Sequence, residues 1–341
     1  MKVSYFDYEL PEELIAQEPV YPRDAARLLV VHRETDRMEF RQFQEIVDYL
    51  RPGDVLVLNE TRVMPARLRG EKESSGGKVE VLLLHPIGPD LWEVLVRPGR
   101  RVQAGASLIF AGGRLRASVV EVKPGGRRVL AFTSPEAVAA VIEEIGLVPL
   151  PPYIKKPLAD SGRYQTVYAR IPGSAAAPTA GLHFTPELLA RVREAGVAVA
   201  RVLLHIGLGT FRPVRVENVE EHQMHAEYFQ IGAEACEVIN RCREGGGRIV
   251  AVGTTAVRVL ETAADQDGRV RPQEGWADLF IYPGYQFRAV EALVTNFHLP
   301  RSTLLMLVCA FAGQERVLRA YQEAVSRRFR FYSFGDAMLI I

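Results

Sequence analysis

The hydrophobic pattern of the chain changes abruptly near residue 67, and this change constrains the fold more than any other sequence feature. Between about 67 and 132, short runs rich in β-branched and aromatic residues follow one another at close spacing. Turn signals such as Gly112-Gly113 and Pro124-Gly125-Gly126 separate them. The runs cover 79–84, 92–96, 108–110, 115–122 and 129–132. Closely spaced short strands of this kind predict a small all-β barrel.

The rest of the chain shows another pattern, in which strands alternate with helices. Helix 186–193 illustrates the signals, because Thr185 can cap it, Pro186 suits its first turn and Gly196 follows its end. Strands that are each followed by a helix favour parallel pairing, so we expect an α/β domain built on a barrel-like or mixed sheet. Predicted strands cover 55–58, 197–204, 248–252 and 292–296, and predicted helices cover 186–193, 233–243, 256–264 and 303–312.

These two patterns predict two domains, as does a length of 341 residues. We expect residues 1–66 and 149–341 to form the α/β domain and residues 67–148 to form an inserted β-barrel domain. A predicted helix over 135–145 closes the insertion. The proline-rich stretch 149–157 forms the connector, since proline suits neither a helix interior nor a central strand.

Charge is distributed unevenly although the formal net charge is only +1. Residues 67–130 contain twelve Lys and Arg against six Asp and Glu, which leaves the remainder of the chain mildly acidic. Clustered positive charge is the electrostatic footprint of phosphate contact, and an arginine-rich solvated surface explains it equally well. Both interpretations stay open at this point.

Cysteine use and hydropathy exclude several classes of protein. Cys236, Cys242 and Cys309 are too few and too irregularly spaced to predict a disulfide framework or a zinc site. No uncharged apolar run reaches the length of a membrane span, and the first residues lack the layout of a signal peptide. We therefore expect a cytoplasmic protein that does not enter membranes.

Unusual residues gather where the predicted strands of the α/β domain end. The segments are His205 to Phe211 with Gly207 and Gly209, Gly253-Thr254-Thr255, and Asn296-Phe297-His298. Ligands bind outside the carboxyl ends of parallel strands, where the next helix directs free backbone N–H groups towards them. These loops are expected to line one site, although tight turns and ordinary helix capping explain Gly207, Gly209 and Thr254 too. The residues expected to share one cleft of the larger domain are His183, His205, Thr254, Asp278 and His298.

Four histidines lie in or beside loops of this kind: His183, His205, His225 and His298. Histidine suits proton transfer near neutral pH, and a structural role is as common for each of them. None shows the spacing of a known zinc motif, so we expect no metal.

Nine motifs run in order along the chain: Asn59-Glu60-Thr61-Arg62-Val63 through Pro65-Ala66-Arg67-Leu68, Gly76-Gly77-Lys78-Val79-Glu80-Val81, Pro149-Leu150-Pro151-Pro152-Tyr153-Ile154, Tyr164-Gln165-Thr166-Val167-Tyr168, Ala177-Pro178-Thr179-Ala180-Gly181-Leu182-His183-Phe184, Gly253-Thr254-Thr255 with Val257-Arg258, Phe280-Ile281-Tyr282-Pro283-Gly284-Tyr285, Leu293-Val294-Thr295-Asn296-Phe297-His298-Leu299-Pro300 and Gly335-Asp336-Ala337-Met338. Together they resemble the S-adenosylmethionine:tRNA ribosyltransferase-isomerase family. Glu60 departs from the pattern, in which an amide or aspartate is expected after Asn59.

The resemblance implies an enzyme that moves the ribosyl group of S-adenosylmethionine onto the aminomethyl-deazaguanine base preQ1 at the wobble position of tRNA. The product is epoxyqueuosine-tRNA, and adenine and methionine leave. It also implies roles for residues of this chain. The base is expected among His183, His205, His225 and His298. His183 is favoured because the small residues Ala180 and Gly181 are expected to leave room for substrate beside it. Asp278 is expected to pair with the sulfonium or with a histidine. The S-adenosylmethionine site is expected to include Gly207, Gly209, Thr210, Gly253, Thr254, Thr255, Tyr282, Asn296 and Phe297, and contacts to tRNA or substrate are expected from Arg62, Arg97, Arg100, Arg101 and Arg258.

Two other classes of protein remain as alternatives. A non-catalytic RNA-binding protein explains the basic β segment but not the histidines at strand ends. A metal-dependent hydrolase explains the histidines but requires tightly bound metal. We expect the chain to act as a monomer on tRNA and S-adenosylmethionine.

Overall fold

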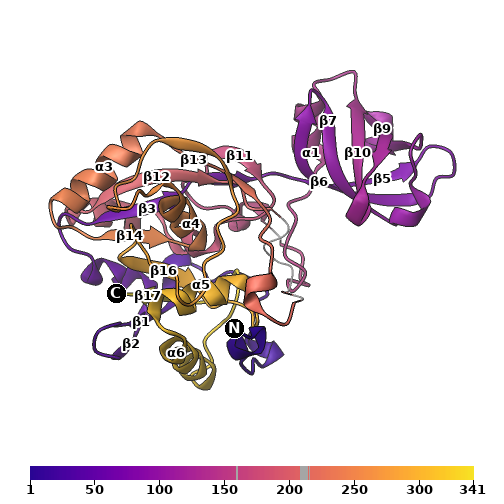
Figure 1. Cartoon of the computed structure of the whole chain (residues 1–341). Coiled ribbons are helices and arrows are strands. Elements are labelled where there is room, and N and C mark those ends of the chain that lie inside the picture. The colour runs from indigo at the N-terminus through magenta and orange to yellow at the C-terminus, as the bar shows by residue number, and fades with distance from the viewer. Residues whose placement is uncertain (159, 208–213, 215) are drawn as a thin grey trace. The chain divides into compact units, whose positions relative to one another are not determined.

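A computed structural model of the chain describes residues 1–158, 160–207, 214 and 216–341 (Figure 1). It divides into two compact units. The larger unit comprises residues 1–62, 152–171 and 177–341, and the smaller comprises residues 63–151 and 172–176. Two short strands, β4 (Thr61–Val63) and β11 (Ile171–Ser174), lie where the chain passes between the units.

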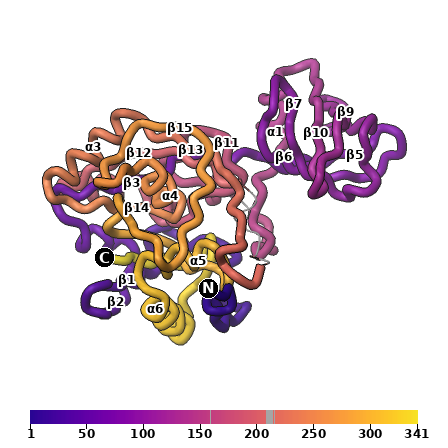
Figure 2. The backbone as a smooth tube through the Cα atoms, viewed as in Figure 1, coloured from indigo at the N-terminus to yellow at the C-terminus, as the bar shows by residue number. Residues whose placement is uncertain are grey.

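A nine-stranded mixed sheet forms the centre of the larger unit. Its four middle strands, β12, β3, β14 and β16, run parallel to one another, while β13, β15 and β2 pair antiparallel with their neighbours. β17 pairs antiparallel with β16 and parallel with β1, so the first and last strands of the sequence lie side by side (Figures 1 and 2). In sheet order the strands are β15 (Gln273–Ala277), β13 (Glu227–Ile231), β12 (Ala198–Leu204), β3 (Val55–Asn59), β14 (Ile249–Val252), β16 (Ala292–Asn296), β17 (Ala337–Ile340), β1 (Arg27–Val31) and β2 (Met38–Gln42).

Five α-helices accompany this sheet: α2 (Pro186–Glu194), α3 (Ala233–Glu244), α4 (Thr254–Ala263), α5 (Thr303–Ala312) and α6 (Gln314–Ser326). α2 begins as its sequence predicts, since the Thr185 hydroxyl accepts a hydrogen bond from the Leu188 N–H and Pro186 occupies the first turn. Leu188, Leu189 and Val192 recur at helical spacing and bury one face of α2 against the sheet. Shorter 3₁₀ helices include η4 (Phe43–Tyr49) and η9 (Thr179–His183).

The smaller unit is a closed six-stranded barrel with the strand order β10-β7-β6-β5-β8-β9. Alternate residues such as Val79, Val81 and Leu83 face its core, which α1 (Val138–Ile145) also joins through Val141 (Figure 1). Gly70 lies where β5 passes close to β8, and a Cβ atom there would meet the Ile109 carbonyl oxygen at 2.4 Å. The strands are β5 (Arg67–Lys72), β6 (Lys78–Gly88), β7 (Leu91–Arg97), β8 (Ser107–Phe110), β9 (Leu115–Val122) and β10 (Arg127–Thr133). A mixed-sheet α/β unit with a small β barrel confirms the predicted fold class.

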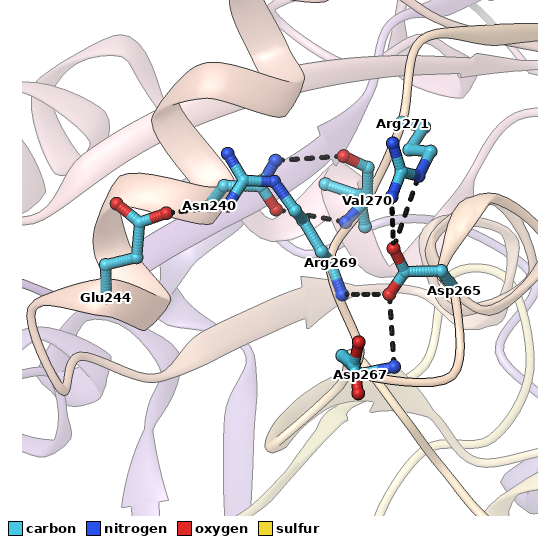
Figure 3. A network of polar contacts seen from close by, with 7 residues as sticks. All are labelled: Asn240, Glu244, Asp265, Asp267, Arg269, Val270 and Arg271. Carbon is cyan, nitrogen blue, oxygen red and sulfur yellow. Dashed lines mark hydrogen bonds and ion pairs between the residues drawn. The ribbon is translucent and has the colours of Figure 1, made fainter.

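A polar network holds the connection between α4 and β15 (Figure 3). The buried Asn240 amide bonds both backbone groups of Val270, at 2.9 and 3.0 Å. Asp265 accepts hydrogen bonds from the backbone N–H groups of Asp267 and Arg269. The turn is thus fixed from the inside by an amide and from the outside by a carboxylate.

Candidate active site

The carboxyl ends of β3, β12, β14 and β16 meet at one edge of the large sheet because these strands are parallel. A pocket lies there, bounded by the residues that follow β12, β14 and β16 and by the segment that leads into η9. The lining residues are Ala177, Pro178, Thr179, Ala180, Ile206, Gly253, Thr254, Thr255, Thr295, Asn296, His298 and Leu304. The sheet therefore brings together the segments after β14 and β16 and Ile206 after β12, whereas Gly207 does not line the pocket.

The N-terminus of α4 opens into this pocket. Gly253 precedes the helix with a φ of 86°, a conformation that favours glycine, and its N–H donates to the Val294 carbonyl at 2.8 Å. No side chain in the described part of the chain caps this end, and the Thr254 hydroxyl has no partner there. The first-turn N–H groups and the positive end of the helix dipole can therefore hold an anion.

Asn59 ties three elements together beneath the pocket. Its buried amide nitrogen donates to the Leu204 carbonyl at 3.0 Å and to the Thr255 hydroxyl at 3.1 Å. Its amide oxygen accepts from the N–H groups of Leu204 and Thr61. Sequence reasoning included Asn59 in a family motif but assigned it no role, since an asparagine at a strand end is more often a turn residue.

Asn296, at the end of β16, lines the pocket and is oriented by three partners. Its amide nitrogen donates to the Tyr332 carbonyl at 3.3 Å and lies 3.2 Å from Nε2 of His183, while its amide oxygen accepts from the Thr179 hydroxyl at 2.9 Å. A carbonyl can only accept, so the amide nitrogen must face Tyr332. His183 Nε2 is therefore an acceptor without a proton.

His183 lies behind Asn296 and does not line the pocket. Its ring is buried and packs against Phe43 with 4.9 Å between centroids. Burial lowers its pKa to about 3, and the charges of Arg330 and Arg23 act in the same direction. The ring is thus neutral, but its acceptor nitrogen is already used. This arrangement favours a positioning role for His183 over direct proton removal.

The small residues beside His183 do not leave room for substrate as the sequence suggested. A Cβ atom on Gly181 would lie 1.9 Å from the Tyr168 hydroxyl, so glycine is required there by packing inside the protein. Ala180 does line the pocket. The expectation that Gly181 leaves room for substrate is therefore wrong, because the Tyr168 side chain already occupies the space beside Gly181.

His298 lines the pocket directly, and its main chain is held on both sides. The His298 N–H donates to the Tyr321 hydroxyl at 3.0 Å, and the Tyr8 hydroxyl donates to the His298 carbonyl. Nε2 lies 2.8 Å from the Thr295 hydroxyl, and no described residue bonds Nδ1. Burial lowers the pKa of His298 to about 3, so this ring too is neutral near pH 7.

The other predicted proton-transfer residues lie outside the pocket lining. His205 follows β12, with Nδ1 2.8 Å from the Thr61 hydroxyl and its ring stacked on Tyr228, and burial lowers its pKa. His225 and Asp278 are exposed to solvent. Of the residues expected to share one cleft, the structure brings Thr254 and His298 into one pocket and places His183 one hydrogen bond away.

The predicted aromatic contacts to the ligand are placed differently from one another. Phe297, which directly follows β16, is fully buried among Tyr321, Phe329 and Phe331, whereas its neighbour Asn296 lines the pocket. Phe297 is therefore a core residue and does not face a bound cation. Tyr282 is half-buried and packs against Phe280.

Arg258, predicted to hold substrate, is instead buried beneath the site. Its guanidinium forms an ion pair with Glu227 and donates to the carbonyls of Ala277 and Leu279. Glu227 also accepts from the Gly207 N–H at 2.7 Å, which links the pair to the loop after β12. From the sequence, Glu227 was expected to orient the ring of His225. Its pairing with Arg258 was not anticipated, because that partner comes from a helix 31 residues away.

The remaining predicted residues lie elsewhere. Gly209 and Thr210 lie outside the described residues. Arg62 is exposed on β4, and Arg97, Arg100 and Arg101 are exposed on the barrel unit. Within the described part of the chain, no group of three His, Cys, Asp or Glu side chains is arranged to hold a metal ion. No helix among the described residues has the length and apolar character needed to cross a membrane.

Known proteins match this chain along nearly its whole length. Residues 3–340 match the family described as queuosine biosynthesis protein. The chain belongs to this family. The family resemblance inferred from the nine motifs is thereby confirmed, and it extends over both structural units.

Curated relatives of similar length share one name, S-adenosylmethionine:tRNA ribosyltransferase-isomerase. Those from Moorella thermoacetica and Desulforamulus reducens are 60% and 58% identical to this chain, and the matches cover 100% of both proteins in each case. The crystal structure of S-adenosylmethionine tRNA ribosyltransferase from Thermotoga maritima is 45% identical and has a TM-score of 0.57, covering 99% of this chain and 100% of that one. The whole chain thus resembles whole proteins of one kind.

The neutral histidines predict a loss of stability in mild acid. In the unfolded chain His183 and His298 bind protons below about pH 6.5, whereas in the folded protein their pKa values are about 3. The unfolded state therefore binds more protons in this window, and the free energy of unfolding falls as pH falls. Between pH 7.5 and 5.5 the two groups together remove at most about 3 kcal/mol.

Urea unfolding at the two pH values measures this loss. The His183→Gln variant should lose about half of the pH dependence that these two rings contribute, because only His298 of the pair then remains. Equal free energies of unfolding at pH 7.5 and 5.5 in the wild-type protein would contradict the assignment of these rings as neutral.

Proposed function

We propose that this chain transfers and isomerises the ribosyl group of S-adenosylmethionine onto the preQ1 base at the wobble position of tRNA. The product is epoxyqueuosine-tRNA, with release of adenine and methionine, and the enzyme acts in the cytoplasm as a monomer. The shared name of relatives that are 58–60% identical over their whole lengths supports this activity. These relatives support neither a non-catalytic RNA-binding protein nor a metal-dependent hydrolase.

The uncapped N-terminus of α4 inside the pocket is the structural observation that carries the proposal. S-adenosylmethionine contains a carboxylate, and the N–H groups of Thr254 and Thr255 with the Thr254 hydroxyl suit such an anion. Gly253 lets the backbone turn into the helix beside it. Asn296 and Thr179, held in one orientation by their mutual hydrogen bond, present polar groups to the rest of the ligand.

The first chemical step requires a proton acceptor beside this pocket. The sulfonium acidifies the adjoining ribose methylene, so a positioned acceptor can remove a proton, which opens the sugar and expels adenine. The acceptor amine of the tRNA base then bonds to the ribosyl carbon, and epoxide closure expels methionine. We assign the proton acceptor to His298, since it lines the pocket and no described residue bonds its Nδ1. His183 positions Asn296.

The decisive test combines the full-length protein with S-adenosylmethionine and tRNA that contains preQ1. Adenine and methionine should appear together, and digested tRNA should contain a nucleoside with the mass of epoxyqueuosine. The same tRNA with unmodified guanine at the wobble position serves as the control and should remain unchanged. Release of neither adenine nor methionine by the folded protein would refute the proposed function.

A further inference from the structure

A second groove, on the β barrel, belongs entirely to the smaller unit and shares no residue with the pocket just described. Its volume is about 640 Å³. Leu82, Leu95 and Val96 contribute apolar surface, and Arg97 and Arg100 stand beside them. The groove therefore combines an apolar floor with exposed positive charge.

Arg97 and Arg100 line this groove and Arg101 follows Arg100 in the chain, and these three differ from other arginines on the same unit. Arg114, Arg116 and Arg127 each form ion pairs with carboxylates, namely Glu136 and Glu144, Glu73, and Glu93. Arg97, Arg100 and Arg101 are exposed, and none has a carboxylate within ion-pair distance in the described chain. Their charge is thus available to an external anion, whereas the charge of the first three is largely compensated.

Acidic residues do little to offset this charge. The groove lining contains Glu80, whose carboxylate lies 3.8 Å from the Arg67 guanidinium on the neighbouring strand. Lys72 approaches from β5 and donates through Nζ to the Arg101 carbonyl at 2.6 Å. Glu80 also lies opposite Arg97 in the register of β6 and β7. The charged residues that line the groove are thus three arginines, Arg97, Arg100 and Arg128, and one glutamate, so positive charge is in excess.

A buried arginine, Arg128, holds the loop and the turn that border the groove. Arg128 donates to the carbonyls of Gly99 at 2.6 Å and Val102 at 3.2 Å, both in the loop after β7, and to the Gly126 carbonyl in the turn before β10. The Arg128 guanidinium donates its hydrogen bonds to backbone carbonyls, so it positions the loop after β7 rather than binding a ligand. The loop that carries Arg100 and Arg101 is consequently fixed against the barrel, which reduces the entropy lost when a partner binds.

We propose that this groove binds a single-stranded segment of the tRNA substrate, with backbone phosphates at Arg97, Arg100 and Arg101 and a base against Leu82 and Leu95. Alternation of anionic phosphates and planar apolar bases matches the alternation of arginine and apolar surface here, and guanidinium planes also stack on bases. This inference rests on the proposed function for the identity of the RNA.

The experiment compares two triple variants of the full-length protein that remove the same charge from the same unit. One is Arg97→Gln with Arg100→Gln and Arg101→Gln, and the control is Arg114→Gln with Arg116→Gln and Arg127→Gln. Binding of an unmodified anticodon stem-loop is measured by fluorescence anisotropy from about 50 to 200 mM salt, a range over which several phosphate contacts change affinity strongly.

The groove variant should bind at least about tenfold more weakly at 100 mM salt, with a salt slope reduced by about 0.7 to 0.9 for each phosphate that the variant no longer neutralises. The control should stay within about twofold of wild type. Leu82→Ala with Leu95→Ala should weaken binding without changing the slope, because it removes apolar surface under the base and no charge.

Equal weakening by both triple variants would overturn the proposal, since general positive charge would then explain RNA binding. Unchanged affinity in the groove variant would also overturn it. Measurements of S-adenosylmethionine binding and of adenine release distinguish failure of the groove proposal from failure of the proposed function. If the wild-type protein releases adenine with preQ1-tRNA and the groove variant binds RNA normally, only the groove proposal is refuted. If the wild-type protein binds neither substrate, the proposed function is refuted.

Discussion

Replacement of His298 by alanine should slow proton removal from the ribose methylene of S-adenosylmethionine by about a hundredfold to ten-thousandfold. The expected cause is loss of the only imidazole among the described residues that line the pocket. S-adenosylmethionine should still bind within a few-fold of wild type, because Thr254 and Asn296 remain. Exchange of the methylene protons with deuterated water, followed by NMR, measures the first quantity, and calorimetry measures the second.

His183 and His225 provide the comparison. His183→Ala should impair binding as well as exchange, because Asn296 then loses the acceptor that orients its amide. His225→Ala should behave like wild type, since His225 is exposed outside the pocket lining. Normal exchange in His298→Ala together with normal binding and lost exchange in His183→Ala would return the role of base to His183, as the sequence favoured.

Replacement of Arg258 by methionine should lower the free energy of unfolding by about 3 to 5 kcal/mol. The change keeps side-chain volume but leaves the Glu227 carboxylate buried without its cation, and it removes two hydrogen bonds to backbone carbonyls. The loop that contains Gly207 should loosen as well, because Glu227 also holds its N–H. Urea unfolding measures the stability, and hydrogen exchange of the Gly207 amide measures the loop.

Two variants test the reason for this loss. Arg258→Met combined with Glu227→Gln should recover part of it, since no unpaired charge then stays buried. Arg269→Met removes an arginine of equal size whose ion pair with Glu244 is exposed (Figure 3), and it should cost no more than about 1 kcal/mol. A loss from Arg258→Met no larger than that from Arg269→Met would show that the buried pair contributes little to stability.

Local patterns were sufficient for much of the fold. The start of α2 at Pro186 follows from Thr185 and proline chemistry, and the parallel strands follow from strands that alternate with helices. The barrel follows from short runs separated by glycine turns, although the pattern does not reveal that Gly70 is required by the closeness of β5 and β8. The closure of the barrel and the close approach of β5 and β8 depend on distances between strands, and the spacing of residues along the sequence does not give those distances.

Parallel strands also allowed the position of the pocket to be anticipated, since their carboxyl ends must share one edge of the sheet. Individual roles were harder to anticipate. Asn296 and Phe297 are neighbours in sequence, yet one lines the pocket and the other is buried among aromatic rings. Asn59 and Glu227 gained roles only through partners that are far away in the chain.

The sequence by itself determined the two fold patterns, the family and the edge of the sheet where this pocket lies, because these depend on local periodicity and on motifs that can be read in order. Tertiary structure decided which side chains enter the pocket, which histidine is engaged by Asn296 and which arginines are already paired. The physical reason is that hydrogen bonding, burial and ion pairing depend on partners brought close by folding, and those partners are separated by tens to hundreds of residues along the chain.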